Sequence, residues 1–253
     1  MFNLNFLISC GLLFLSLASC TKDAKDTDLV TNQVGTSAPM VDALFAIDSV
    51  GKDVQFFTET YTVASQKERL KLQRNPSQML PTGFAAKANS SLTLHVELVE
   101  GSRAPDVMIG TYERGKDRHK VQQKPLTVGD NTIHTEEGGI IWIVYVNKEP
   151  HSKAKVTFIE GHHPLPVFIK NKTSQQEWQR QLTAFNTNNE VLMIGQRVYM
   201  VYDKDLHSNV GTQDNNEILG AADFTFDVQD DFSGLDGSSP QHERLPIRLL
   251  MVH

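Results

Sequence analysis

The chain has 253 residues, a formal net charge of -6 and a hydrophobic content of 40%. This length supports one large domain or two small ones with real hydrophobic cores. A nucleic-acid partner needs a concentrated basic face, and the mild acidity without a run of Lys and Arg argues against such a partner.

Residues 1–19 are expected to be a signal peptide. The apolar run FLISCGLLFLSLASC is too short to span a membrane comfortably, and polar sequence follows it. The run ends in Leu17-Ala18-Ser19-Cys20, which resembles a bacterial lipobox, although no Lys or Arg precedes the run. We therefore predict a lipid on Cys20 and a protein anchored to the bacterial outer membrane or cell surface. The alternative is an ordinary secretory signal in which Cys20 occurs by chance.

Cleavage before Cys20 would also decide the thiol chemistry of the mature chain. The sequence has two cysteines, so removal of Cys10 and lipidation of Cys20 would leave no free thiol. This excludes thiol catalysis, zinc held by cysteine and an intrachain disulfide. The stability of the protein must then come from its hydrophobic core.

The next two segments lead up to the folded part. Residues 20–40 are polar and rich in turn-forming residues, which is typical of a flexible tether. Residues 41–75 give a mixed signal. FFTETYTV is compatible with a strand, whereas ASQKERLKLQ favours a helix that ends at Asn75-Pro76.

Residues 76–161 are predicted to form a β-sandwich-like domain. Strand patterns lie at 92–98, 106–112, 138–146 and 154–160. The segment GGIIWIVYV is a continuous apolar run, long enough for a strand that is buried on both faces. A turn is expected at Gly129-Asp130-Asn131. Short strands with turns between them and no clear helix favour a sandwich.

Residues 162–253 change in character and are predicted to be α+β. Ser174 and Glu177 have the spacing of a capping box, and a helical stripe of Trp178, Leu182 and Phe185 follows. The segment EVLMIGQRVYMVY predicts a pair of strands that is broken near Gly195-Gln196.

Two further elements are expected towards the end of the chain. Residues 217–235 are predicted to form an amphipathic helix, whose apolar stripe consists of Ala221, Phe224, Val228, Phe232 and Leu235. The closing RLPIRLLMVH predicts a terminal strand with nothing after it to cover its faces.

The histidines give no complete motif for metal chemistry. His-Glu-x-x-His places two imidazoles on one helical face, but Pro246 stands where the second His should follow His242-Glu243. His95 and Glu97 resemble the His-x-Glu of zinc deaminases, without the cysteine pair that this motif needs. His162-His163 is open to two interpretations, a weak metal site or a turn between two domains.

Other site types also lack their motifs. No Gly-x-Ser-x-Gly elbow and no Gly-rich phosphate loop are present. The acidic residues Asp230, Asp231 and Asp236 lack the ligand spacing of an EF-hand and indicate the solvated end of a helix. The aromatic residues considered for stacking on sugars are Trp142, Tyr145, Tyr112 and Trp178. The two tryptophans lie in core patterns, so no glycan site is assigned.

Several segments occur in an order typical of one protein family. They are LPTGFAAKANSSLTLHVE, VMIGTY, PLTVGDNTI, GGIIWIVYV, KVTFIEG, EWQRQL and DDFSGLDGSSPQHERLPIRLLMV. The series, over about residues 75–252, resembles the enhancin-like zinc metallopeptidases of peptidase family M60. This family includes viral enhancins and mucin-degrading bacterial lipoproteins. The resemblance implies a β-sandwich-like domain that leads into an α+β catalytic domain.

The resemblance also implies what this chain lacks. In the family, zinc is held by His-Glu-x-x-His and a downstream Glu, and no position of this chain matches these residues. LPIRLLMV would be an early strand of the catalytic domain, with the zinc helix still to follow. We therefore expect a mainly β, α+β fragment of a mucin-directed zinc metallopeptidase. It would have no catalytic residue, no metal ligand and no zinc of its own, zinc being a cofactor of full-length relatives only.

Two alternatives stay open at this point. One is a surface lipoprotein that binds a glycan or a mucin-type O-glycoprotein through the β-sandwich. The other is a fragment without function, in which the sandwich folds and residues 162–253 pack poorly because their apolar stripes lack partners.

Overall fold

The computed structural model describes residues 47–58, 77–111, 120–146, 152–196, 198–204, 214–233 and 245–248. All of these residues belong to one compact unit. The predicted signal peptide with Cys20, the predicted tether and the predicted helix ASQKERLKLQ lie outside the described residues. None of the described helices is long and apolar enough to cross a membrane.

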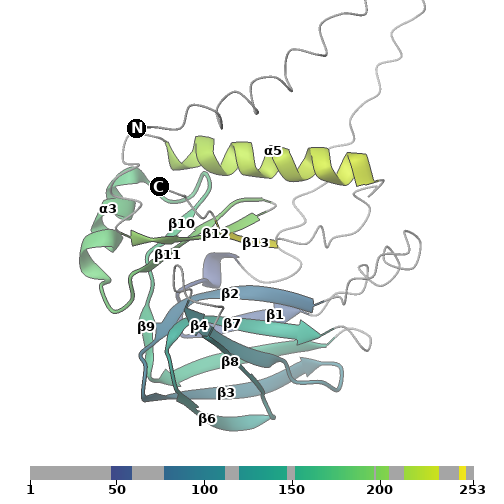
Figure 1. The fold of residues 1–253 in the computed structure, drawn as a ribbon. Helices are drawn as coiled ribbons and strands as arrows, with labels where there is room; N and C mark the ends of the chain where they lie inside the picture. Colours follow the sequence, from purple (N-terminus) through teal and green to yellow (C-terminus); the bar gives the residue numbers. More distant parts are fainter. Residues whose placement is uncertain are drawn as a thin grey trace, which may run out of the picture. The chain divides into compact units, whose positions relative to one another are not determined.

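Two antiparallel sheets form the first half of the described chain (Figure 1). The first sheet has the strand order β1-β8-β3-β6, and the second has the order β5-β4-β7-β2-β9. The strands are β1 (Val54–Thr58), β2 (Ser77–Ala86), β3 (Ser90–Glu100), β4 (Asp106–Thr111), β5 (Lys120–Pro125), β6 (Gly129–Thr135), β7 (Gly139–Val146), β8 (Lys153–Glu160) and β9 (His162–Pro164). A short 3-10 helix, η2 (Ile47–Ser49), precedes β1.

The two sheets pack face to face around one hydrophobic core, which confirms the predicted sandwich. The alternating pattern of β3 and β8 buries the expected side of each strand, including Leu94, Val156 and Phe158. These side chains share a core with Val107 and Ile143 of the second sheet. Strands with period-two alternation thus turn their apolar faces inward and leave polar residues in water.

A third sheet explains the continuous apolar run of β7. Its strands follow the order β10-β11-β12-β13, and they are β10 (Val167–Ile169), β11 (Glu190–Ile194), β12 (Val198–Asp203) and β13 (Leu245–Arg248). The Trp142 ring of β7 lies 6.2 Å from the Tyr199 ring of β12, and both rings belong to the core that the sandwich shares with this sheet. The prediction that β7 is buried on both faces is therefore confirmed.

Two helices contribute to a second core with the third sheet (Figure 1). These helices are α3 (Gln175–Ala184) and α5 (Asn215–Ser233). Trp178 of α3 and Leu219 of α5 are fully buried against sheet residues such as Met193 and Met200. All of β11 and most of β12 are buried as a result. The expectation that residues after 162 pack poorly is therefore wrong for this sheet and for the buried sides of the two helices.

Helix α3 begins as the sequence predicts. The Ser174 hydroxyl accepts a hydrogen bond from the backbone N–H of Glu177 at 3.2 Å, so Ser174 is the N-cap. The Glu177 carboxylate accepts two 2.7 Å hydrogen bonds from Arg180, which lower the pKa of Glu177 to about 2. Trp178 is buried and Leu182 is partly buried, whereas Phe185 is the C-cap residue.

Helix α5 lies where the sequence predicts it, but the predicted apolar stripe is not its buried face. Phe224, Val228 and Phe232 are 68%, 48% and 94% exposed. The buried side instead carries Leu219 and the carboxylate of Asp223. The spacing of apolar residues fixes the helical period, whereas contacts with the sheet decide the rotation of the helix about its axis.

Two smaller predictions need correction, and a third is borne out in part. Strand β6 already begins at Gly129, so the turn precedes it, and the Asn131 side chain closes that turn by accepting a 2.8 Å hydrogen bond from the Thr127 N–H. His162-His163 lies in a strand that pairs with β2, and not in a turn between two domains. The expected terminal strand is present as β13 over Leu245–Arg248, and the rest of that expectation, residues 249–253, lies outside the described residues.

Candidate functional site

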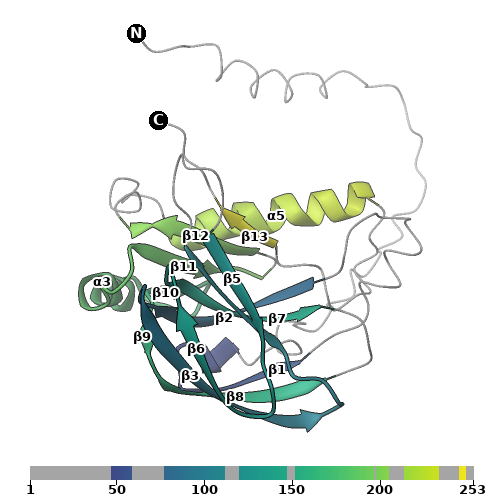
Figure 2. The same ribbon diagram turned by 60° about the horizontal axis from the view of Figure 1, so that its bottom comes forward.

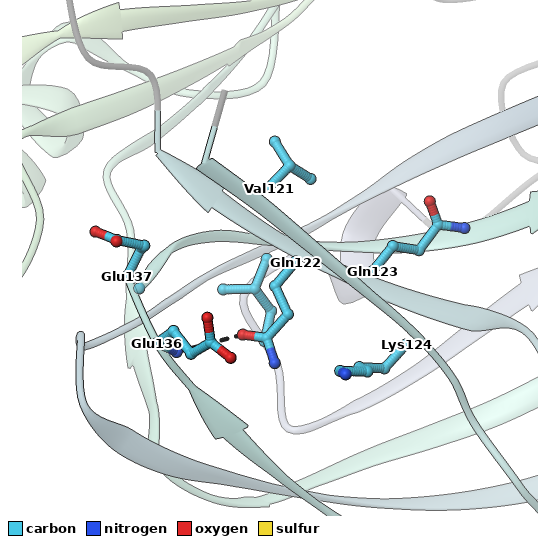
Figure 3. A pocket seen from close by; sticks show the side chains of 8 residues that line it. Val121, Gln122, Gln123, Lys124, Glu136 and Glu137 are labelled. Carbon is cyan, nitrogen blue, oxygen red and sulfur yellow. Dashed lines mark hydrogen bonds between the residues drawn. The ribbon is translucent and has the colours of Figure 1, made fainter. Parts of the chain in front are cut away.

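A polar pocket of about 460 Å³ opens at one edge of the sandwich (Figure 3). Its walls come from β4, β5 and the turn between β6 and β7. The lining residues are Ile109, Val121, Gln122, Gln123, Lys124, Glu136, Glu137 and Gly138. Both β5 and β6 are edge strands, one in each sheet of the sandwich (Figure 2). The pocket residues on β5 and after β6 therefore lie at an edge of the sandwich.

The register of β5 against β4 decides which side chains face the pocket. Gln122 pairs with Ile109 and Lys124 pairs with Val107, and both β4 residues are buried in the sandwich core. Paired residues of neighbouring strands point to the same face of a sheet, so Gln122 and Lys124 lie on the inward side at the mouth of the sandwich. Figure 3 shows their ends on the same side of β5 as Glu136.

Gln122 links the two sheets across this mouth. Its side-chain Nε2 donates a 2.7 Å hydrogen bond to the backbone oxygen of His134 in β6. Its Oε1 accepts a 3.3 Å hydrogen bond from the backbone N–H of Glu136. Both ends of the amide are therefore held, and Gln122 forms a fixed wall of the pocket.

The turn that carries Glu136 and Glu137 is anchored to the turn that links β2 to β3, where the chain passes from the second sheet to the first. The backbone oxygen of Glu136 accepts a 3.2 Å hydrogen bond from the Asn89 N–H. Gly138 has a φ of +72°, and a Cβ at this position would come within 2.5 Å of the Ala88 nitrogen. Only glycine fits such a position. The carboxylates are thus presented by a constrained backbone.

The pocket brings together groups of opposite charge. Lys124 supplies an ammonium, Glu136 and Glu137 supply carboxylates, and the nearly buried Ile109 also belongs to the lining. Gln123 is oriented by a 2.7 Å hydrogen bond from its Nε2 to Asp106. This set of donors and acceptors can bind a polar ligand, and it offers no nucleophile paired with a general base.

The histidine and acidic pair suggested by the zinc-deaminase pattern lies elsewhere, on the exposed face of the first sheet. His95 Nδ1 forms a hydrogen bond with Asp130, while its Nε2 lies 4.0 Å from Glu97. Glu97 pairs with Lys155 at 2.7 Å, and this hydrogen bond lowers the pKa of Glu97. The carboxylate of Glu97 is thus held by a lysine, which is a structural arrangement on a solvated face.

His162 and His163 have different surroundings in β9. The His162 Nε2 lies 3.0 Å from Asp53, and its ring packs against Phe84 and Phe158 with centroids 4.6 and 5.6 Å away. Burial lowers the pKa of His163. Among the residues that the structure describes, no three His, Cys, Asp or Glu side chains lie close enough to hold a metal ion. The described residues therefore do not fit a zinc site.

The remaining sequence candidates are buried or lie outside the described part. Trp142, Tyr145 and Trp178 are core residues, at most 4% exposed. Cys20, Tyr112, Asp236 and His242 lie outside the described residues, as do the side chains of Asp230 and Asp231. The sequence did not predict this pocket, because KVQQKP shows no alternation of apolar residues that would indicate a strand. The only sequence signal for the pocket is the Gln and Lys residues of KVQQKP together with the Glu-Glu-Gly segment that follows β6.

Comparison with known proteins identifies solved structures of similar fold. No family model and no curated protein matches the chain. A functionally unknown conserved protein from Bacillus anthracis matches over 77% of this chain and 40% of its own, with a TM-score of 0.61 and 22% identity. The catalytic module of the metalloprotease ZmpA from Clostridium perfringens matches over 79% and 44%, with a TM-score of 0.61 and 15% identity.

A third solved structure is the M60 catalytic domain of Clostridium perfringens ZmpC in complex with the sialyl T antigen. It matches over 72% of this chain and 41% of its own, with a TM-score of 0.55 and 17% identity. The chain therefore has the mainly β, α+β fold of a part of M60 metallopeptidase domains. It spans about two fifths of the length of these solved structures.

Proposed function

We propose that this chain is part of an enhancin-like zinc metallopeptidase directed at mucin-type glycoproteins, and that this chain alone does not hydrolyse peptide bonds. The observation that carries the proposal is the match of fold with the ZmpA catalytic module over 79% of the chain. The sequence contains no His-Glu-x-x-His, and such a zinc centre needs both imidazoles and the glutamate. A fold that matches part of the peptidase module, together with a sequence without the zinc motif, supports the proposal.

The full chain is expected neither to cleave a mucin-type O-glycopeptide nor to bind zinc stoichiometrically. Mass spectrometry of the glycopeptide after incubation with protein and zinc tests cleavage, and elemental analysis after dialysis tests zinc binding. A parallel sample with chelator is the control for a contaminating peptidase. Cleavage that persists through purification and is abolished by the chelator would contradict the proposal.

The lipid anchor at Cys20 belongs to the same proposal. It is supported by the order Leu17-Ala18-Ser19-Cys20 at the end of a short apolar run. We expect mass spectrometry of the protein expressed in a bacterium to find an acylated N-terminal Cys20 in the membrane fraction. A Cys20→Ser variant is expected to lose the lipid. A wild-type chain whose mature N-terminus carries no lipid would reject the anchor.

A second candidate function is binding of a glycan or mucin-type glycoprotein through the sandwich. The observation in its favour is the polar pocket between β5 and the β6–β7 turn, which belongs to the sandwich itself. The ZmpC domain of similar fold was solved in complex with a glycan antigen, which makes a saccharide the first ligand class to test.

A further inference from the structure

We propose that the pocket between β5 and the β6–β7 turn binds one saccharide residue, with Lys124 and Glu136 as the side chains that hold its hydroxyl groups. This inference rests on the second candidate function and names its site. It does not depend on whether the chain is derived from a peptidase.

The size and lining of the pocket favour a small polar ligand. Its volume of about 460 Å³ lies within the range of roughly 300–1,000 Å³ that is usual for small-molecule sites. Most such sites are lined mainly by apolar side chains, whereas this one is lined mainly by amides, carboxylates and an ammonium. A ligand that matches this lining must form many hydrogen bonds.

The charges favour a neutral ligand over a simple ion. Lys124 would repel a cation, while Glu136 and Glu137 would repel an anion, and all three belong to one pocket. A hydroxyl group both donates and accepts, so it can bond to the ammonium and to a carboxylate. A saccharide residue presents several hydroxyl groups, so it can bond to both kinds of side chain at once.

The walls are already fixed without a ligand. The two hydrogen bonds of the Gln122 amide hold the β6–β7 turn against β5, and the left-handed Gly138 lets this turn lie close to the turn that links β2 to β3. A site that is ordered in advance loses less conformational entropy when the ligand binds. Binding therefore requires ordering of only a few side chains, chiefly Lys124 and Glu136.

The test uses the full chain and defined small probes. Two-dimensional NMR titrations with methyl α-galactoside, methyl α-N-acetylgalactosaminide and a serine-linked N-acetylgalactosamine glycopeptide would locate the site and give dissociation constants. We expect millimolar affinity for at least one probe, with shifts confined to β5 and residues 136–138. The double variant Lys124→Met/Glu136→Gln should weaken binding by about tenfold, because it removes two charged hydrogen-bonding groups.

A matched control is available on another face of the same domain. Lys155 and Glu97 form a 2.7 Å ion pair on the exposed side of the first sheet, so Lys155→Met/Glu97→Gln makes the same chemical changes away from the pocket. This control should bind the probes as the wild type does. Equal urea unfolding curves of both double variants would show that the loss of binding is not a loss of fold.

Other outcomes would overturn the inference in different ways. Glycoside binding that Lys124→Met/Glu136→Gln leaves unchanged would reject this pocket but keep glycan binding by the sandwich. Free serine bound at the pocket in place of the glycosides would assign the site to a zwitterionic ligand. If no glycoside binds in the millimolar range, both the pocket and the second candidate function fail. The peptidase-derived proposal is judged separately, by the cleavage and zinc measurements.

Discussion

Replacing Gly161 with alanine is expected to lower the free energy of unfolding by roughly 3–5 kcal/mol. Gly161 lies between β8 and β9, where the chain passes from the first sheet to the second. Its φ of +80° is left-handed, and a Cβ at this position would overlap the backbone oxygen of Ser91. Backbone atoms of β3 cannot move aside without disturbing the pairing of β3 with β8, so the overlap cannot be relieved locally.

A variant at a second glycine separates the two causes of this loss of stability, which are the left-handed backbone conformation and the overlap of the added Cβ. Gly51 has a nearly equal φ of +77°, but a Cβ there would have nothing within 4 Å. Gly51→Ala should therefore cost only the left-handed conformation, about 1–2 kcal/mol. Urea unfolding of both variants, followed by tryptophan fluorescence, measures the difference. Equal losses for Gly51→Ala and Gly161→Ala would contradict a steric cause at Gly161.

The strands that could be predicted from the sequence are those whose burial produces a regular pattern of apolar residues. β3 and β8 face the core on one side only, so their alternation could be read directly. β7 is covered on both sides, and its unbroken apolar run reflects this. β5 was not predicted, because an exposed edge strand needs no apolar residue at every second position.

The candidate site could not be predicted from the sequence for a related reason. Gln122 and Glu136 are 14 positions apart, and their contact depends on how β5 and β6 meet at the sandwich edge. Neither strand pairs with the other, because they belong to different sheets. Sequence spacing carries no information about such a contact until the topology is known.

The second large loss of stability is expected from removing the contacts that orient α5. Asp223 is 4% exposed, and its side chain accepts hydrogen bonds from the Lys170 ammonium at 2.9 Å and the Gln196 N–H at 3.0 Å. These contacts join α5 to the end of β10 and to the turn between β11 and β12. Gly195 leaves room for this, because a Cβ there would come within 2.6 Å of the Asp223 carboxylate. A charged residue therefore sets the buried face of a helix whose apolar stripe faces solvent.

Asp223→Ala is expected to lower the free energy of unfolding by roughly 3–5 kcal/mol, because it leaves the ammonium of Lys170 poorly solvated and without its carboxylate. The side chains of Lys170 and Asp223 are only 18% and 5% exposed. Urea unfolding gives the loss. Hydrogen exchange is expected to show faster exchange along α5 than in β7.

An exposed ion pair of nearly the same length provides the comparison. Lys172 and Asp48 are 2.8 Å apart, but their side chains are 48% and 78% exposed. Water replaces such a partner readily, so Asp48→Ala should lower the free energy of unfolding far less than Asp223→Ala does. A double variant, Lys170→Met/Asp223→Leu, removes both buried charges and should recover part of the loss seen for Asp223→Ala. If Asp223→Ala proves as mild as Asp48→Ala, the ion pair does not hold α5. Packing of Leu219 must then fix the helix instead.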